Sequence, residues 1–271
     1  MRLRALFAAL LLPLLLASCD DGLSSLNEDP NNPTSVSPDL ILPYSIEQGV
    51  DNVLQPSIGL EFANLVVQHW ARVSSTDPDR YIYSNGIFNS LWERSYRTVL
   101  RDYAEIEKLG RADGHVNYEA VGLILKSWGF SVVTDAYGDV PYSQALKGEE
   151  GVQFPAFDPQ EAVYDSLLVN LEQAARLIDP DGPPIEGDIL FDGDLDRWQR
   201  FANALRLRLL LRISGRRDVS SEMQDILTSE PLPRSNDDNA VLHYLEQRPN
   251  ENPFANLPSG RRDQFRISQT M

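Results

Sequence analysis

The sequence predicts an all-α protein, and two observations lead to that prediction. Through most of the chain beyond residue 38, apolar residues recur at three- and four-residue steps, the spacing that places them on one face of a helix. Runs that alternate between apolar and polar residues are scarce, and only Tyr81-Ile82-Tyr83 suggests a short strand. Successive helices joined by brief loops favour an antiparallel helical array.

The chain begins with the layout of a secretory signal peptide, residues 1–18. Two arginines come first, an apolar stretch too short to span a bilayer follows, and Ala17-Ser18 provides a small-residue cleavage site. Cys19 comes next and is the only cysteine, so it cannot form an intrachain disulfide. We expect Cys19 to be lipidated through a thioether at its thiol, as in bacterial lipoproteins, which this pattern resembles. The alternative is an ordinary secretory peptide followed by an unrelated cysteine.

Residues 19–38 are expected to be a lipidated cysteine and a flexible tether, because they are rich in Asp, Asn, Ser and Pro and nearly lack apolar residues. Asp20 and Asp21 resemble the acidic export signal of Bacteroidetes-type lipoproteins, which implies the outer cell surface. Without residues 1–18 the chain has 22 basic and 40 acidic residues, a formal charge of −18. Such a surface repels phosphate backbones and anionic headgroups, which argues against nucleic-acid binding and against a polybasic membrane contact.

The helical domain is expected to cover residues 39–271. Its apolar periodicity predicts seven helices in order, at residues 39–54, 58–74, 88–109, 116–134, 158–178, from 194 or 196 to 213, and 219–228. No W-x2-L-G pattern recurs at the 34-residue period of tetratricopeptide units. The sequence therefore indicates a helical array without a clear repeat.

Two of these helices have the clearest signals. Before the helix at 158–178, Asp158 can act as an N-cap, Pro159 can take the first helical position and Glu161 fits a capping box. The next helix begins after an N-cap at Asp194 or Asp196, and Gly215 ends it. The apolar residues expected to face the core are Val163, Leu167, Leu171, Ala174 and Ile178 in the first, and Trp198, Phe201, Leu205, Leu209 and Ile213 in the second.

Four aspartates at 188, 192, 194 and 196 raise the question of a calcium site, because alternate carboxylates in a loop can converge on a hard cation. The spacing departs from the EF-hand pattern, since Gly193 comes too early and no glutamate closes the loop. We therefore expect a capped, solvated loop and no metal.

Catalytic motifs are absent from the sequence. The three histidines are far apart, and no HExxH, GxSxG, Walker or dinucleotide-binding pattern occurs. We expect a protein that is not an enzyme and carries no cofactor. The strongest catalytic alternative is a secreted glycoside hydrolase. Such an enzyme needs a pair of catalytic carboxylates, and the many Asp and Glu residues of this chain could include such a pair. A third class is a helical scaffold that binds only protein partners.

Residues 135–146 read DAYGDVPYSQAL and resemble the Asp-x-x-Gly-Asp-Val-Pro-Tyr turn of the SusD/RagB-like family, lipoprotein subunits of Bacteroidetes nutrient-uptake complexes. By chemistry alone this is a turn after a helix, and Tyr137 and Tyr142 are expected to pack against it. The resemblance continues along the chain in the same order as in the family. Its further parts are Asn27 to Pro33, Phe157-Asp158-x-Gln160, Val163-Tyr164, Gly193-Asp194-Leu195-x-x-Trp198, Phe201-Ala202-Asn203-x-Leu205-Arg206-Leu207-Arg208 and Asn252-Pro253-Phe254.

The resemblance implies tetratricopeptide-like antiparallel helix pairs with loop-rich insertions. It also implies an outer-membrane lipoprotein that binds oligosaccharides or peptides without catalysis and delivers them to a TonB-dependent SusC-like transporter. Members of this family are considerably longer than 271 residues. We therefore expect a chain truncated at its C-terminus, lacking much of the loop-rich part.

A carbohydrate site stacks sugar rings on aromatic side chains and fixes the hydroxyl groups with polar or charged ones. The candidate ligand residues lie on either side of the loop at residues 74–79, and they are Trp70, Arg72, Arg80, Tyr81 and Tyr83. Trp70 also ends an apolar helix stripe, so a place in the core is the alternative for it. Trp92, Trp128 and Trp198 fit helical periods and are expected to be packing residues.

Overall fold

The computed structural model describes residues 36–83, 86, 88–247, 249–255 and 257–269. The predicted signal peptide, Cys19 with its expected lipidation, and the predicted tether up to residue 35 lie outside the described residues. All elements below belong to one unit of the chain, Ser37–Met271.

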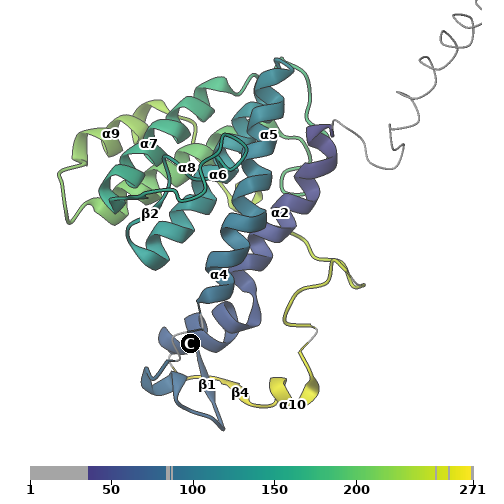
Figure 1. Ribbon diagram of the computed structural model, residues 1–271, viewed down its shortest axis with the longest axis vertical. Helices are drawn as coiled ribbons and strands as arrows, with labels where there is room; N and C mark the ends of the chain where they lie inside the picture. The colour runs from purple at the N-terminus through teal and green to yellow at the C-terminus, as the bar shows by residue number, and fades with distance from the viewer. Residues whose placement is uncertain (1–35, 84–85, 87, 248, 256, 270–271) are drawn as a thin grey trace, which may run out of the picture. The chain divides into compact units, whose positions relative to one another are not determined.

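Helices dominate the described part of the chain, as predicted (Figure 1). The α-helices are α2 (Pro38–Leu54), α3 (Asn64–Val66), α4 (Asn89–Arg94), α5 (Leu100–Ala112), α6 (Val116–Tyr137), α7 (Gln160–Leu177), α8 (Leu195–Ile213), α9 (Ser220–Ser229) and α10 (Ser259–Arg262). Two π-helical segments, η2 (Pro56–Ala63) and η4 (Ser95–Val99), and two 3₁₀ turns, η3 (Pro78–Arg80) and η5 (Asn236–Asp238), complete the helical set. The short strands are β1 (Trp70–Arg72), β2 (Val140–Pro141), β3 (Phe157–Asp158) and β4 (Phe265–Ile267).

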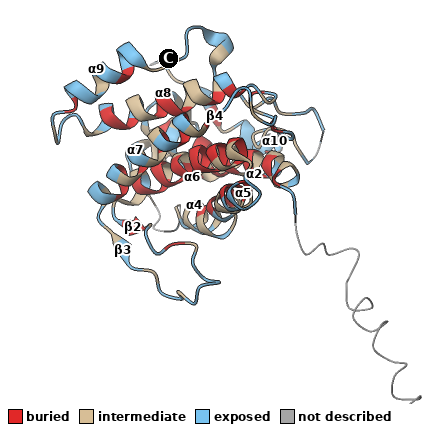
Figure 2. Ribbon diagram, turned by 90° about the horizontal axis from the view of Figure 1, so that it is seen from above, coloured by how far each residue is buried: buried red, intermediate tan, exposed pale blue. Residues whose placement is uncertain are grey.

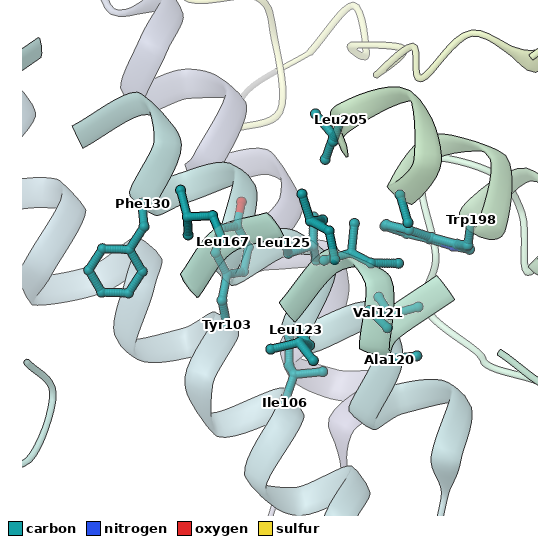
Figure 3. Packing of buried hydrophobic residues seen from close by; sticks show 14 of the residues in the cluster. Tyr103, Ile106, Ala120, Val121, Leu123, Leu125, Phe130, Leu167, Trp198 and Leu205 are labelled. Atoms are coloured by element: carbon teal, nitrogen blue, oxygen red, sulfur yellow. The ribbon is translucent and has the colours of Figure 1, made fainter. Parts of the chain in front are cut away.

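The core is built by α5 to α8, each of which packs on the next, while α2 packs on α5. Helix α6 is the central one: its stretch Ala120–Leu125 is buried on every side rather than along the single predicted stripe (Figure 2). Side chains from the neighbouring helices converge on it, among them Tyr103 of α5, Leu167 of α7 and Trp198 of α8 (Figure 3). The apolar spacing read from the sequence thus creates one continuous core.

The predicted core faces of α7 and α8 are confirmed. Val163, Leu167 and Leu171 are fully buried, and so is Trp198. Phe201 is half-buried and packs edge-on against Phe191, with ring centroids 5.8 Å apart. Residues of this chain therefore cover the aromatic start of α8.

Three local predictions were wrong. The helix expected at 58–74 ends at Val66, and residues 70–72 form strand β1 instead. Tyr81-Ile82-Tyr83 is not a strand, because Tyr81 adopts a left-handed conformation with φ of 60°. Asp158 does not cap α7, whose N-cap is Pro159, so the predicted capping box is absent.

Asp158 instead belongs to the small sheet formed by β2 and β3, where Val140 pairs with Asp158 and Pro141 with Phe157. Its carboxylate accepts hydrogen bonds from the backbone N–H groups of Tyr142 (2.9 Å) and Ser143 (2.8 Å) and from the Ser143 hydroxyl (2.8 Å). Burial alone would raise the pKa of Asp158, but these hydrogen bonds outweigh it and lower the pKa. At the N-terminus of α7, the Asp139 carboxylate accepts a hydrogen bond from the Gln160 backbone N–H at 2.9 Å.

None of the helices in the described residues is both long enough and apolar enough to cross a bilayer.

Candidate functional site

Strand β1 holds two of the predicted ligand residues, and it exists because β4 pairs with it. The pair is antiparallel, with Trp70 opposite Ile267, Ala71 opposite Arg266 and Arg72 opposite Phe265. Side chains two residues apart on a strand share one face, so Trp70 and Arg72 point the same way.

That shared face packs against Phe265. The Trp70 and Phe265 rings meet edge-on, with centroids 6.0 Å apart, and the Arg72 guanidinium lies 5.4 Å from the centroid of the same Phe265 ring. Gln264 accepts a hydrogen bond from Arg72 at 2.8 Å. Trp70 and Phe265 pack in a small apolar cluster with Leu60, Leu65 and Leu257. Trp70 is therefore partly buried in this cluster, in line with the alternative that it is a core residue.

The loop after β1 folds back onto the strand. The Asp79 carboxylate accepts the Arg72 backbone N–H at 3.1 Å, which holds the 3₁₀ turn beside β1. Arg80 reaches back to Asp77 at 2.6 Å in a largely exposed ion pair. Tyr81 is 55% exposed, and its hydroxyl lies 3.4 Å from the Val66 carbonyl oxygen. The candidates Arg80 and Tyr81 are therefore on the surface.

Tyr83 lies apart from the Phe265 contact, in an aromatic group with Phe62 and Phe88. The Phe62 ring is edge-on to both, with centroids 5.0 Å from Tyr83 and 4.6 Å from Phe88. The five candidates are thus divided: Trp70 and Arg72 meet at Phe265, Tyr83 packs on Phe62, and Arg80 and Tyr81 line the loop between them.

Several buried polar atoms of this region have no hydrogen-bond partner among the described residues. They are Arg72 Nε, Asp79 Oδ2 and the Tyr83 hydroxyl oxygen. Buried polar groups in folded proteins are normally satisfied, so each such atom calls for an explanation. These three atoms lie below the surface, and the Tyr83 hydroxyl belongs to the aromatic group at Phe62 rather than to the Phe265 contact.

Sequence reasoning missed Asp79, Gln264 and Phe265. Asp79 was within the recognised loop and could have been included as an acceptor beside Arg72. Gln264 and Phe265 are far along the chain, and no local pattern connects them with Trp70. Only the pairing of β1 with β4 brings them to the site.

The aspartate loop before α8 has a structural explanation. Asp188 is buried, and its carboxylate accepts four N–H groups, those of Leu190 (2.9 Å), Phe191 (3.2 Å), Gly193 (3.0 Å) and the Trp198 indole (2.7 Å). Asp194 caps α8, as predicted, by accepting the Arg197 backbone N–H at 3.1 Å. In the part of the chain that the structure describes, no cluster of three or more His, Cys, Asp or Glu side chains could hold a metal ion.

The turn at residues 135–146 joins α6 to its neighbours. The Tyr137 hydroxyl donates to the Phe88 carbonyl oxygen at 2.6 Å, and Asn170 of α7 donates to the Tyr142 hydroxyl at 2.7 Å. Burial raises the pKa of Tyr142 to about 12, so this phenol stays neutral. The Asp135 carboxylate accepts a hydrogen bond from the Tyr164 hydroxyl and forms an ion pair with Arg212 at 3.1 Å. Both tyrosines therefore pack the turn, as expected from the sequence.

Comparison with solved structures gives consistent matches. A SusD homologue from Bacteroides fragilis is 25% identical, with 87% of this chain and 49% of that chain covered and a TM-score of 0.67. An outer-membrane protein from Bacteroides vulgatus, whose description connects it with nutrient binding, is 29% identical over 81% of this chain and 46% of that one, with a TM-score of 0.68. A protein described as chitin-binding is 28% identical over 76% and 46%, with a TM-score of 0.67.

The chain spans about half the length of these structures. Comparison with curated proteins finds no match. The SusD-like family, described as starch-binding and associating with the outer membrane, matches residues 30–271. This match covers most of the chain, and it agrees with the helical fold and with the turn at 135–146. The chain therefore belongs to the SusD-like family of non-catalytic binding proteins associated with the outer membrane.

Proposed function

We propose that this chain acts as a cell-surface lipoprotein that binds nutrient oligosaccharides and delivers them to a TonB-dependent SusC-like transporter. The family match over residues 30–271 is the observation that carries the proposal. Oligosaccharides are favoured over peptides because the family description names starch and one similar structure is described as chitin-binding.

We place the ligand contacts of this chain at Trp70, Arg72, Arg80, Tyr81 and Tyr83, together with Asp79. Three features support this choice. The region has aromatic rings, its Arg80 and Tyr81 side chains are exposed, and Tyr81 is held at a positive φ of 60°. A bulky residue in that conformation is strained, and such strain concentrates at binding sites.

Two surface substitutions test the site without disturbing the Phe265 cluster. We expect Tyr81→Ala and Arg80→Ala each to weaken binding of chitohexaose or maltohexaose about tenfold, equivalent to ~1.4 kcal/mol, because each removes an exposed stacking or donor group. Isothermal titration calorimetry with both glycans measures this. Arg80 and Tyr81 side chains are largely exposed, so neither change should alter the fold.

Tyr44→Ala is the matched control, since Tyr44 is a 53% exposed tyrosine on α2, outside this region. It should leave the affinity unchanged. Equal losses for Tyr44→Ala and Tyr81→Ala would show that the site lies elsewhere. Release of new reducing ends during the titration would contradict a pure binding role.

We also propose that Cys19 is lipidated through a thioether at its thiol and that this lipid holds the protein in the outer membrane. Each buried acyl methylene contributes about 0.8 kcal/mol, so two or more chains give stable anchoring. We expect Cys19→Ser to move the protein from the membrane pellet to the soluble fraction of cells. Mass spectrometry of the unsubstituted protein should find the acyl chains on Cys19, and an unmodified Cys19 at the mature terminus would refute the proposal.

A further inference from the structure

A groove of about 590 Å³ lies between α7, α8 and α9. Leu168 and Val169 of α7, Leu210 of α8 and Ile226 of α9 give it an apolar floor. Val169 is 63% exposed, so part of this floor is open to water. The volume is within the range of sites that hold small molecules or short peptide segments.

The charged side chains that line the groove are not balanced. Its three arginines all have carboxylate partners: Arg206 lies 3.6 Å from Glu172 and 3.8 Å from Glu230, and Arg217 lies 2.6 Å from Asp165. Arg176 pairs with Glu172 as well. Glu222 and Asp225 of α9 remain without an ion-pair partner among the described residues. The groove therefore has two uncompensated negative charges beside an apolar floor.

The lining argues against three classes of ligand. No Trp, Tyr, Phe or His lines the groove, so a sugar ring would find no aromatic face on which to stack. Nucleic acid and anionic lipid are repelled by the carboxylates. What remains complementary is a chain segment with aliphatic side chains for the floor and a lysine or arginine for Glu222 and Asp225.

We propose that the α7–α9 groove binds a short peptide segment of a protein partner that carries aliphatic and basic side chains. Glu222 and Asp225 would form ion pairs with the basic side chains of that segment. Grooves between paired helices serve as peptide sites in helical repeat proteins, which use their concave surfaces in this way. The proposal does not depend on the nutrient site at β1, which shares no residue with the groove.

Two synthetic octapeptides test the proposal by fluorescence anisotropy, one alternating leucine with lysine and one alternating leucine with glutamate. We expect the lysine peptide to bind saturably and the glutamate peptide not to bind. Raising the salt concentration should weaken the lysine peptide, since exposed charges are screened. Charge reversal in the double variant E222K/D225K should weaken it at least tenfold. Val169→Ser should weaken it several-fold through loss of floor contact.

The double variant D113K/D181K is the matched control, because it changes net charge equally at two exposed aspartates outside the groove. It should bind the lysine peptide nearly as well as the unsubstituted chain does. Equal weakening in both double variants would overturn the proposal, because binding would then follow net charge alone. Binding of the glutamate peptide, or of chitohexaose in competition with the lysine peptide, would overturn it too. Circular dichroism of each variant confirms that the helical fold is retained.

Discussion

Gly122→Ala should destabilise the protein by about 2–3 kcal/mol, although alanine is the better helix former. Gly122 lies in the middle of α6, where propensity alone predicts that alanine would stabilise by ~1 kcal/mol. A β-carbon at this position would lie 2.4 Å from the Glu107 backbone nitrogen and 2.8 Å from its α-carbon. Helix propensity and steric crowding change the free energy of unfolding in opposite directions. The sign of the measured change therefore shows which of the two effects is larger.

The steric effect should dominate because the obstructing atoms are backbone atoms. A side chain can rotate away from a new methyl group, but the Glu107 backbone moves only if α5 shifts away from α6. That shift would open the core contacts of Tyr103 and Ile106, both fully buried. It would also disturb the ion pairs that the Glu107 carboxylate forms with Lys126 and Arg111 where α5 crosses α6.

Thermal unfolding followed by circular dichroism measures the loss, which should appear as a midpoint lower by ~5–10 °C. Gly215→Ala is the matched control, since Gly215 is exposed and a β-carbon there meets nothing within 4 Å. It should change the midpoint little. If Gly122→Ala raised the midpoint instead, the close approach of α5 and α6 would not be as tight as described.

Helix positions were predictable because local spacing determines them. The predicted span 39–54 corresponds to Pro38–Leu54, and 116–134 to Val116–Tyr137. The same periodicity does not reveal that α6 is buried all round, since burial depends on how many neighbours surround a helix. Nor does it reveal the close approach of α5 at Gly122, because nothing in the apolar spacing singles out that position.

The candidate site was harder to predict because its parts come from distant segments. Local composition identified Trp70, Arg72 and the loop that follows, but β1 was read as the end of a helix. The apolar period continues through Trp70, and only the pairing with β4 makes these residues a strand. Tertiary pairing thus overrides local propensity at the site. The predicted N-cap of α7 was wrong for a similar reason. Asp139, which is distant in sequence, accepts the hydrogen bond from the first backbone N–H of the helix, and Asp158 does not.

Asp188→Asn is expected to have the other large effect, a loss of about 2–4 kcal/mol of unfolding free energy. The aspartate accepts four N–H donors, and the two oxygens of its carboxylate divide them equally. Asparagine has nearly the same shape, but its amide nitrogen would face two of those donors. If the nitrogen took the place of Oδ2, the Gly193 N–H and the buried Trp198 indole N–H would both lose their acceptor; in the place of Oδ1, the Leu190 and Phe191 N–H groups would. The loss should be larger than for a surface change because unsatisfied groups at this site are shielded from water.

Chemical denaturation of Asp188→Asn and Asp192→Asn distinguishes this role from a general effect of charge in the loop. Asp192 is exposed, has φ of 56° and accepts no hydrogen bond among the described residues, and asparagine tolerates that conformation equally well. Asp192→Asn should therefore be close to neutral. The indole N–H resonance of Trp198, assigned through Trp198→Phe, should shift only in Asp188→Asn. Calcium chloride and EDTA should leave the unfolding midpoint of the unsubstituted chain unchanged, because N–H donors already occupy the Asp188 oxygens. A midpoint that rose with calcium would mean that a cation competes with those donors, and the loop would then be a binding site rather than a hydrogen-bonded brace for α8.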